Sequence, residues 1–266
     1  MAPRQEQPAF PHPAREAHLS VLPVNGHPGF RYAIKPERIK ISVGLASHDM
    51  VPFKFTYDLM CLTMHSIANL NEDTEFGVVK VQGTYVHSAR QQLLQAALHK
   101  DSTHLLWIDT DMAFPKDALL RLMAHGKPFV GINYCNRGLP YEFVGIKKVS
   151  WDPDGVTEKL VTAKDSTGLE ECEALGFGMF LMDLRLVRQF LPPLEEKPWF
   201  WFEWISGKRQ VGEDVRFCKM ITDAGHKIFC DHDLSRECGH IGQHEYECST
   251  AEVMMRPEVV EAMAAL

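Results

Sequence analysis

The stretch that decides the fold is HLLWIDTDMAF, residues 104–114, where an apolar run ends in two aspartates one residue apart. Residues 105–108 are continuously apolar, which is typical of a strand buried on both faces of a parallel sheet. Side chains two positions apart on an extended chain point the same way, so Asp109 and Asp111 should converge. Ligands gather at the carboxyl ends of such strands. The pair therefore predicts a divalent-cation site or, in the simpler alternative, a turn capped by Asp111 beside a solvated Asp109.

The flanking sequence alternates strand patterns with helix patterns. Pro115 should open a helix that Gly126 closes, Ser88 and Asp183 should cap two others, and Gly225 should end the last. The expected strands are residues 38–47, 75–83, 128–134, 176–184 and 226–231 in addition to 105–108. This order predicts an α/β, Rossmann-like, mostly parallel sheet flanked by helices, with a small antiparallel excursion at 147–172.

Composition and length limit the class of protein. The 266 residues suffice for one large α/β domain, with 45% hydrophobic and 24% charged residues, the usual globular range. Residues 1–38 are rich in proline and predict an extended arm before a domain at 39–266. A net charge of −7 argues against indiscriminate coating of nucleic acid. Seven cysteines without a secretion signal or a membrane-length apolar run predict reduced thiols in the cytoplasm.

Five features in this order resemble the GT-A-fold glycosyltransferases, especially their compact bacterial and phage-type members. The resemblance extends over about residues 39–245. The features are Arg90, LLWIDTDMAF, GFG at 176–178, Glu213-Asp214 and His240 within CGHIG.

The resemblance implies a metal-dependent transferase that uses a nucleotide-sugar, with UDP-sugar as the expected donor. The metal would be Mn²⁺, which an imidazole beside carboxylates favours, or Mg²⁺. By the resemblance Asp111 binds the metal, Asp109 holds the ribose or a metal-bound water, and His240 supplies the third protein ligand.

Further positions follow from the resemblance for the nucleotide and the sugar. The end of the first strand should face the base, through Ala46, Ser47 and His48. Arg90 should reach the base or the phosphates, unless it is a solvated helix residue. Gly176 and Gly178 should let the backbone approach the donor sugar, unless they form a simple β-bulge.

The carboxylates at the start of the 213–225 helix are the expected catalytic pair. In inverting relatives Asp214 would deprotonate the acceptor hydroxyl, with Glu213 beside it. In a retaining enzyme Asp214 would instead position hydroxyl groups. A helix N-terminus also favours carboxylates for purely structural reasons.

The aromatic segment KPWFWFEWISGKRQ, residues 197–210, predicts an acceptor wall. Its expected contacts are Trp199, Trp201 and Trp204, with Arg137 from another loop. At least half of the aromatic rings should instead fill the core. A hydroxymethylated pyrimidine in phage DNA ranks narrowly first as acceptor. A saccharide, a protein or a small molecule fits these residues equally well.

Two rival classes remain. Residues 230–248 contain three cysteines and three histidines, which could hold structural zinc in a binding module, although their spacing lacks the usual C-x₂₋₄-C knuckle. A nucleotidyltransferase is disfavoured, because residues 43–52 after the first strand hold one glycine rather than a glycine-rich phosphate loop.

Overall fold

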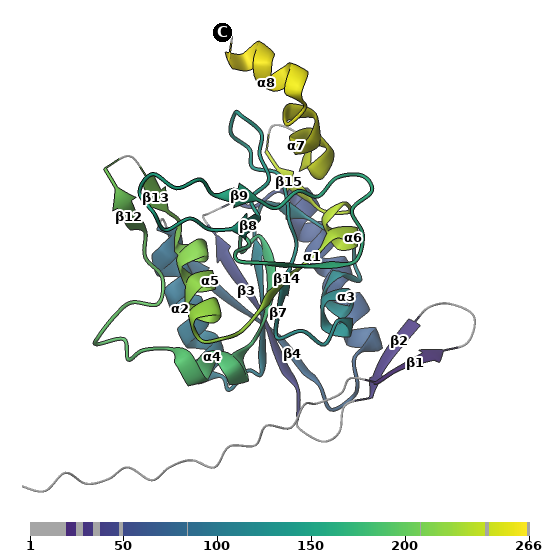
Figure 1. Ribbon diagram of the computed structural model, residues 1–266. Helices are drawn as coiled ribbons and strands as arrows, with labels where there is room; N and C mark the ends of the chain where they lie inside the picture. Colours follow the sequence, from purple (N-terminus) through teal and green to yellow (C-terminus); the bar gives the residue numbers. More distant parts are fainter. Residues whose placement is uncertain are drawn as a thin grey trace, which may run out of the picture.

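A computed structural model of the chain describes residues 20–24, 29–33, 38–47, 50–83, 85–207, 209–242 and 245–264. Its centre is a seven-stranded sheet of order β10-β14-β7-β11-β5-β3-β4, with helices on both faces (Figure 1). The strands are β3 (Lys40–Ser47), β4 (Glu75–Gln82), β5 (His104–Asp109), β7 (Phe129–Gly131), β10 (Leu169–Cys172), β11 (Met179–Asp183) and β14 (Ile228–Asp231).

The sheet is mixed but mostly parallel. β3 pairs in parallel with β4 and β5, and β14 pairs in parallel with β7. β11 lies antiparallel between β5 and β7, and β10 is antiparallel to β14. Five strands therefore run in one direction, and β10 and β11 run in the other. The expected class, an α/β protein with a helix-flanked and mostly parallel sheet, is confirmed.

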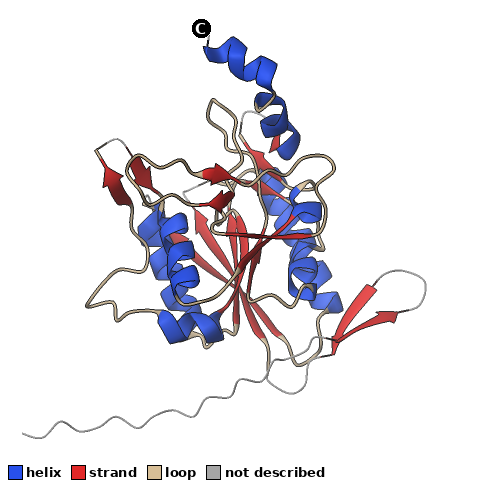
Figure 2. Cartoon of the chain, viewed as in Figure 1, coloured by secondary structure: helices blue, strands red, loops and turns tan. Residues whose placement is uncertain are grey.

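The helices form two layers on either side of the sheet. One layer holds α2 (Val86–His99), α4 (Leu184–Phe190) and α5 (Glu213–Asp223), and the other holds α1 (Phe53–Asn69), α3 (Ala118–Ala124) and α6 (His232–Ser235) (Figure 2). The last helices are α7 (Cys248–Met254) and α8 (Pro257–Ala264), and α8 projects from the body in Figure 1.

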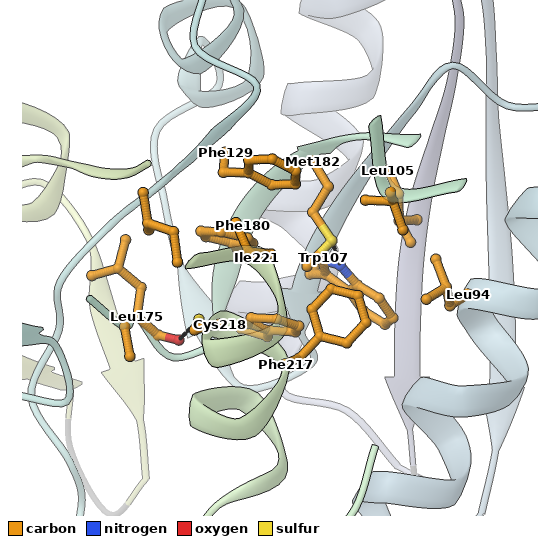
Figure 3. Packing of buried hydrophobic residues seen from close by; sticks show 14 of the residues in the cluster. Leu94, Leu105, Trp107, Phe129, Leu175, Phe180, Met182, Phe217, Cys218 and Ile221 are labelled. Atoms are coloured by element: carbon orange, nitrogen blue, oxygen red, sulfur yellow. Dashed lines mark hydrogen bonds between the residues drawn. The ribbon is translucent and has the colours of Figure 1, made fainter. Parts of the chain in front are cut away.

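Each helix layer packs on its own apolar core. Beneath α2 and α5 the core is aromatic, with Phe200 stacked on Phe217 at 4.7 Å between ring centroids. Trp107 of β5 lies in the same cluster and donates from Nε1 to Met182 Sδ at 3.2 Å (Figure 3). The other core joins β3, β5 and β7 to α1 and α3. Because β5 is covered on both faces, its continuous apolar run is explained.

Short antiparallel strand pairs lie outside the main sheet. They are β1 (Ser20–Val24) with β2 (Gly29–Ala33), β8 (Ile146–Lys148) with β9 (Glu158–Lys159), and β12 (Glu203–Ser206) with β13 (Arg209–Val211). A three-stranded sheet joins β6 (Met112–Ala113), β15 (Gly239–Ile241) and β16 (Glu245–Glu247). β15 matters most, because it brings the late histidine to the segment that follows β5.

Most local signals place the elements correctly. The Asp183 side chain accepts from the Arg185 amide and caps α4, and Gly126 and Gly225 have the positive φ that ends a helix. The prediction that Ser88 caps a helix is wrong, because α2 begins two residues earlier at Val86.

The antiparallel excursion is smaller than expected, because only β8 and β9 form a separate hairpin. The last four residues of 147–172 form β10, which joins the edge of the main sheet. Of the expected arm at 1–38, the structure describes mainly β1 and β2, which pair with each other. Within the described ranges no helix is both long and apolar enough to cross a membrane.

Candidate functional site

The candidate site lies where β3 and β5 end side by side. Ala46 is paired with Asp109 in the parallel register, and the Thr110 hydroxyl donates to the Ala46 carbonyl at 3.3 Å. Ala46 and Ser47 are therefore at the sheet edge where a nucleotide was expected, whereas His48 lies outside the described residues. Their contact with a base stays a prediction.

Arg90 of α2 is the buried centre of an ionic network. Its side chain is 5% exposed, and Nη1 donates to Glu213 Oε1 at 2.7 Å. Its Nη2 reaches both carboxylate oxygens of Asp109 at 3.2 Å, and Nη1 lies 3.8 Å from Asp214 Oδ2. Arg90 is thus not a solvated helix residue. It holds together acids from β5 and α5 that are far apart in the sequence.

Burial and charge oppose each other in this network. Burial raises the pKa of Asp109 and of Glu213 above their ordinary values, and the Arg90 guanidinium offsets part of that rise. Burial alone would lower the pKa of Arg90, but the surrounding carboxylates raise it. Arg90 therefore stays charged, and its charge favours the ionised forms of Asp109 and Glu213 where burial opposes them.

Asp111 and His240 form a second, more accessible pair. Asp111 lies in the turn between β5 and β6, and its carbonyl accepts from the Ile241 amide at 2.6 Å. His240 of β15 is paired with Met112 in the strand register. These backbone contacts bring His240 Nε2 to 3.4 Å from Asp111 Oδ1. The predicted convergence of Asp111 with a late histidine is present.

A hydrogen bond from the other ring nitrogen fixes the tautomer of His240. Nδ1 lies 3.1 Å from the Cys135 carbonyl, and because a carbonyl only accepts, Nδ1 must donate. In this tautomer the lone pair of Nε2 faces Asp111, so Nε2 is the nitrogen that could bind a metal ion. A ring nitrogen bonded to a backbone carbonyl is also how proteins orient metal-binding histidines.

Asp111 also has an arginine partner. Arg137 Nη2 lies 2.8 Å from Asp111 Oδ2, and Arg137 Nη1 donates to the Ile241 carbonyl at 3.1 Å. Burial would raise the pKa of Asp111, but His240 and Arg137 outweigh it and lower that pKa. Each aspartate of the pair thus has its own cation, Arg90 for Asp109 and Arg137 for Asp111. Arg137 is thus bound to the turn that holds Asp111, and its contact with an acceptor stays a prediction.

These residues offer two of the ligands that a metal ion needs, and the other ligands would have to come from elsewhere. The described part of the chain has no group of three or more His, Cys, Asp or Glu side chains that could hold a metal ion. Asp111 and His240 offer one oxygen and one nitrogen ligand, while Asp109 is bound to Arg90 instead. Mg²⁺ and Mn²⁺ commonly complete their shells with waters and substrate phosphates. A site with two protein ligands therefore suits an ion that arrives with a nucleotide.

The two glycines of GFG make room for the side chain of Tyr134. A Cβ at Gly176 would lie 2.3 Å from the Tyr134 hydroxyl, and one at Gly178 would lie 2.6 Å from Tyr134 Cζ. The buried Tyr134 hydroxyl accepts from the Gly178 amide at 3.2 Å, and its ring meets His240 edge-on at 5.4 Å. Tyr134 thus accounts for the absence of side chains at these two positions, and the approach of their backbone to a donor sugar stays a prediction. Tyr134 itself was missed, and the glycine spacing is the sequence signal that pointed to a close neighbour.

The two carboxylates of α5 have different surroundings. Glu213 is 7% exposed at its side chain and is tied to Arg90, whereas Asp214 is 20% exposed. Asp214 Oδ1 accepts from the Val215 amide at 2.7 Å, and its other oxygen faces Arg90. Of the predicted catalytic pair, Asp214 is the member that can meet a substrate, and Glu213 is the member that positions Arg90.

The tryptophans predicted to bind the acceptor divide between core and surface. Trp199 is 8% exposed, and its indole N–H donates to the Pro192 carbonyl at 2.8 Å, so it has little free surface. Trp201 lies between Lys197 and Arg216, with cations 4.2 and 4.4 Å from its ring centroid. Trp204 is 64% exposed. Trp199 is therefore corrected to a core residue, whereas Trp204 is exposed and its contact with an acceptor stays a prediction.

A second aromatic group, which the sequence reasoning missed, lies at the start of α2. Tyr85 is 69% exposed and its ring centroid is 5.9 Å from that of His87. His87 in turn meets Phe202 at 5.5 Å, and Phe202 is 41% exposed. His87 lies three residues before Arg90, so these rings flank the ionic network. Their separation in sequence hides this cluster from inspection of the chain.

The described cysteines and histidines of residues 230–248 are bonded to other groups of the fold and do not form a metal site. The buried His232 is held by the Thr162 hydroxyl and by Glu170, each at 2.9 Å. Cys230 lies 3.6 Å from the Ser235 hydroxyl, and Cys248 donates to the Ser235 carbonyl at 3.4 Å. His244 is outside the described residues. All seven cysteines are free thiols, and the described members form no metal-holding group.

Comparisons with known proteins inform the fold but not the chemistry. No protein-family model matches the chain, and no curated protein matches it. Among solved structures, one titled "Crystal Structure of A197 from STIV" is similar, with a TM-score of 0.50 and 16% identity. The match covers 77% of this chain and 86% of that chain. At this identity the likeness concerns the α/β arrangement alone.

Proposed function

We propose that this chain is a metal-dependent glycosyltransferase with a GT-A-like fold. It would move a sugar from a nucleoside-diphosphate donor, by the resemblance a UDP-sugar, to an acceptor hydroxyl. The support is the meeting of the DTD turn, the ED pair and the late histidine at one sheet edge. These motifs come from three distant parts of the chain and were expected together only on the resemblance.

The single observation that carries the proposal is the pairing of His240 with Asp111. The Cys135 carbonyl fixes the imidazole with Nε2 toward the carboxylate 3.4 Å away. These two side chains would hold Mn²⁺ or Mg²⁺, which as a Lewis acid offsets the charge of the departing diphosphate. Arg137, 2.8 Å from Asp111, would have to yield part of its contact or turn to the phosphates.

Asp214 is the proposed base. Its partial exposure lets it reach an acceptor, while the Val215 amide and Arg90 orient its oxygens. In an inverting transfer Asp214 takes the proton of the acceptor hydroxyl as that oxygen bonds to the anomeric carbon. The bond to the diphosphate breaks in the same step, and the leaving group takes the electron pair. Arg90, bridging Asp109 and Glu213, is a positioning residue.

The acceptor is proposed to meet the exposed rings at the site's rim. Trp204 and Phe202 offer faces on which a sugar or an unpaired base can stack. A hydroxymethylated pyrimidine in DNA is the first acceptor to test, with oligosaccharides as the alternative. DNA would need to present that base outside the helical stack.

Donor hydrolysis and transfer test the proposal. Nucleotide-sugars are incubated with Mn²⁺ and purified protein, and nucleoside diphosphate release is measured with and without each acceptor. Asp111→Asn and His240→Gln should abolish release while the fold, followed by circular dichroism, is kept. Glu171→Gln is the matched control. Glu171 is an exposed carboxylate on the outermost strand β10, away from β3 and β5, and it is bound to Lys227. Undiminished turnover in both site variants would refute the metal assignment.

A further inference from the structure

Helix α1 is apolar on two faces, although only one faces the core. Its inner face buries Phe55 and Leu62 against the sheet. On the outer face and just before it, six large apolar side chains have exposed fractions between 58% and 90%. We call them the outer stripe: Met50, Phe53, Tyr57, Met60, Met64 and Ile67. A helix that is apolar all round is normally buried all round. We therefore expect the outer stripe to be covered by a partner.

The spacing of the outer stripe indicates what kind of partner fits. Successive members are three, four, three, four and three residues apart. An alternation of three and four is the a/d pattern of a coiled-coil seam, which a second helix fills with knobs into holes. A strand would instead present side chains with a period of two. The occupant that matches the stripe is therefore another helix.

The charges on α1 favour a protein partner over a lipid surface. Lys54 and Asp58 are its only lysine, arginine or acidic residues, and they pair with each other at 3.1 Å. Helices that lie on membranes carry several cations for anionic lipids. Here no such group is present on the helix, and the whole chain has a net charge of −7.

We propose that the outer stripe is a dimer interface in which α1 packs antiparallel against α1 of a second copy. The stripe is self-complementary when reversed, since Phe53 and Tyr57 lie toward the start of α1 whereas Met60 and Met64 lie closer to its end. With a two-fold axis beside the middle of the helix, Phe53 faces Met64 of the second copy and Tyr57 faces Met60. The same register sets Met50 against Ile67. Each contact occurs twice, as an isologous interface requires, and aromatic rings against methionine sulfur are favourable.

The size of the stripe agrees with a dimer. Six side chains this large and this exposed present on the order of 800 Å² of apolar surface, which is what one partner contributes to an interface of standard size. The largest apolar patch of a typical monomer is about 300–600 Å². A rival occupant is the chain's own N-terminal segment, because β2 lies against α1.

Sedimentation equilibrium of the full chain between about 1 and 100 μM tests the proposal, since an interface of this size commonly gives micromolar or tighter binding. Wild type should dimerise. Met60→Glu should weaken the dimer at least about 100-fold, because two like charges would be buried near the two-fold axis. Val156→Glu is the matched control, since Val156 is 90% exposed in the loop between β8 and β9, and it should leave the dimer unchanged.

A charge exchange tests the register. Tyr57→Lys alone should also weaken the dimer, and mixing it with Met60→Glu should restore a mixed dimer through facing opposite charges. Wild type that stays monomeric at 100 μM overturns the proposal and leaves the N-terminal segment as the occupant. A dimer that survives both single variants overturns it too. The proposal is also overturned if the protein is a monomer that binds lipid vesicles and if Met60→Glu abolishes that binding.

Discussion

Replacing Arg90 by methionine should be among the most damaging single changes in this protein. The guanidinium is 5% exposed and carries bonds to Asp109 and Glu213, while the aliphatic part of the side chain is kept in the variant. The guanidinium carbon also lies 5.2 Å from the Phe177 ring centroid, a contact that methionine can partly replace. Removing one partner of a buried ion pair costs about 3–5 kcal/mol, because an uncompensated charge is left behind. At roughly 2–4 °C per kcal/mol for a chain of this size, the melting temperature should fall by about 10 °C.

The pH dependence identifies the cause. Burial already raises the pKa of Asp109 and Glu213 above 3.8 and 4.5, and loss of the arginine would raise both further. The folded variant then binds protons more readily than the unfolded chain, so its stability rises as the pH falls toward those raised pKa values. The cost of Arg90→Met should therefore be largest near about pH 8 and smaller near about pH 5.

Urea unfolding at several pH values measures this, with two further variants as controls. Glu213→Gln added to Arg90→Met should recover part of the loss, because one stranded charge is removed. Arg188→Met should cost about 0–1 kcal/mol, since its partner Asp101 is 91% exposed at the side chain. A loss below about 1 kcal/mol for Arg90→Met, or one that does not change with pH, would refute the reasoning.

Three further predictions concern the base, the glycines and an acid-sensitive pair. Asp214→Asn should cut transfer by about two orders of magnitude or more while donor affinity, measured by calorimetry, stays near wild type; a near-normal rate would make it a helix-end carboxylate only. Gly178→Ala should destabilise by about 1–3 kcal/mol in thermal unfolding because its Cβ would lie 2.6 Å from the tyrosine ring, whereas Gly77→Ala, with nothing within 4 Å, should not. Burial opposes ionisation of Asp231, but its histidine partner and a backbone amide outweigh burial and lower its pKa below 3.8. The ionised carboxylate of Asp231 therefore stabilises the fold above about pH 3.8, and this stabilisation is lost as the pH falls through the lowered pKa. Asp231→Asn should be less stable than wild type near about pH 6, and the difference in stability should vanish in acid.

The sequence predicts the frame of the fold because that frame rests on local signals. The apolar run before Asp109, the capping by Asp183 and the glycines at helix ends each act within a few residues. The reversal of β11 between β5 and β7 is not local, since a buried apolar strand has the same composition in either direction. Likewise β10 becomes an edge strand because β14 offers it a free side, which its own polar sequence does not reveal.

The candidate site also has residues that the sequence predicts and residues that it does not. Residue type and order suggested Asp111, His240 and Asp214, and the structure brings them to one sheet edge. The burial of Arg90 and the place of Tyr134 behind the glycines depend on contacts between distant segments. A single sequence shows that something must approach a glycine closely, but it does not show which side chain does so.

The most direct test of the central claim is electron paramagnetic resonance of Mn²⁺ bound in the presence of UDP, with the histidines labelled with ¹⁵N. If Asp111 and His240 hold the ion, the spectrum should show one directly coordinated imidazole nitrogen, and that coupling should vanish in His240→Gln. Nucleotide should also tighten Mn²⁺ binding in wild type and not in Asp111→Asn. Manganese that binds with oxygen ligands alone, or that does not bind with the nucleotide, would contradict the account.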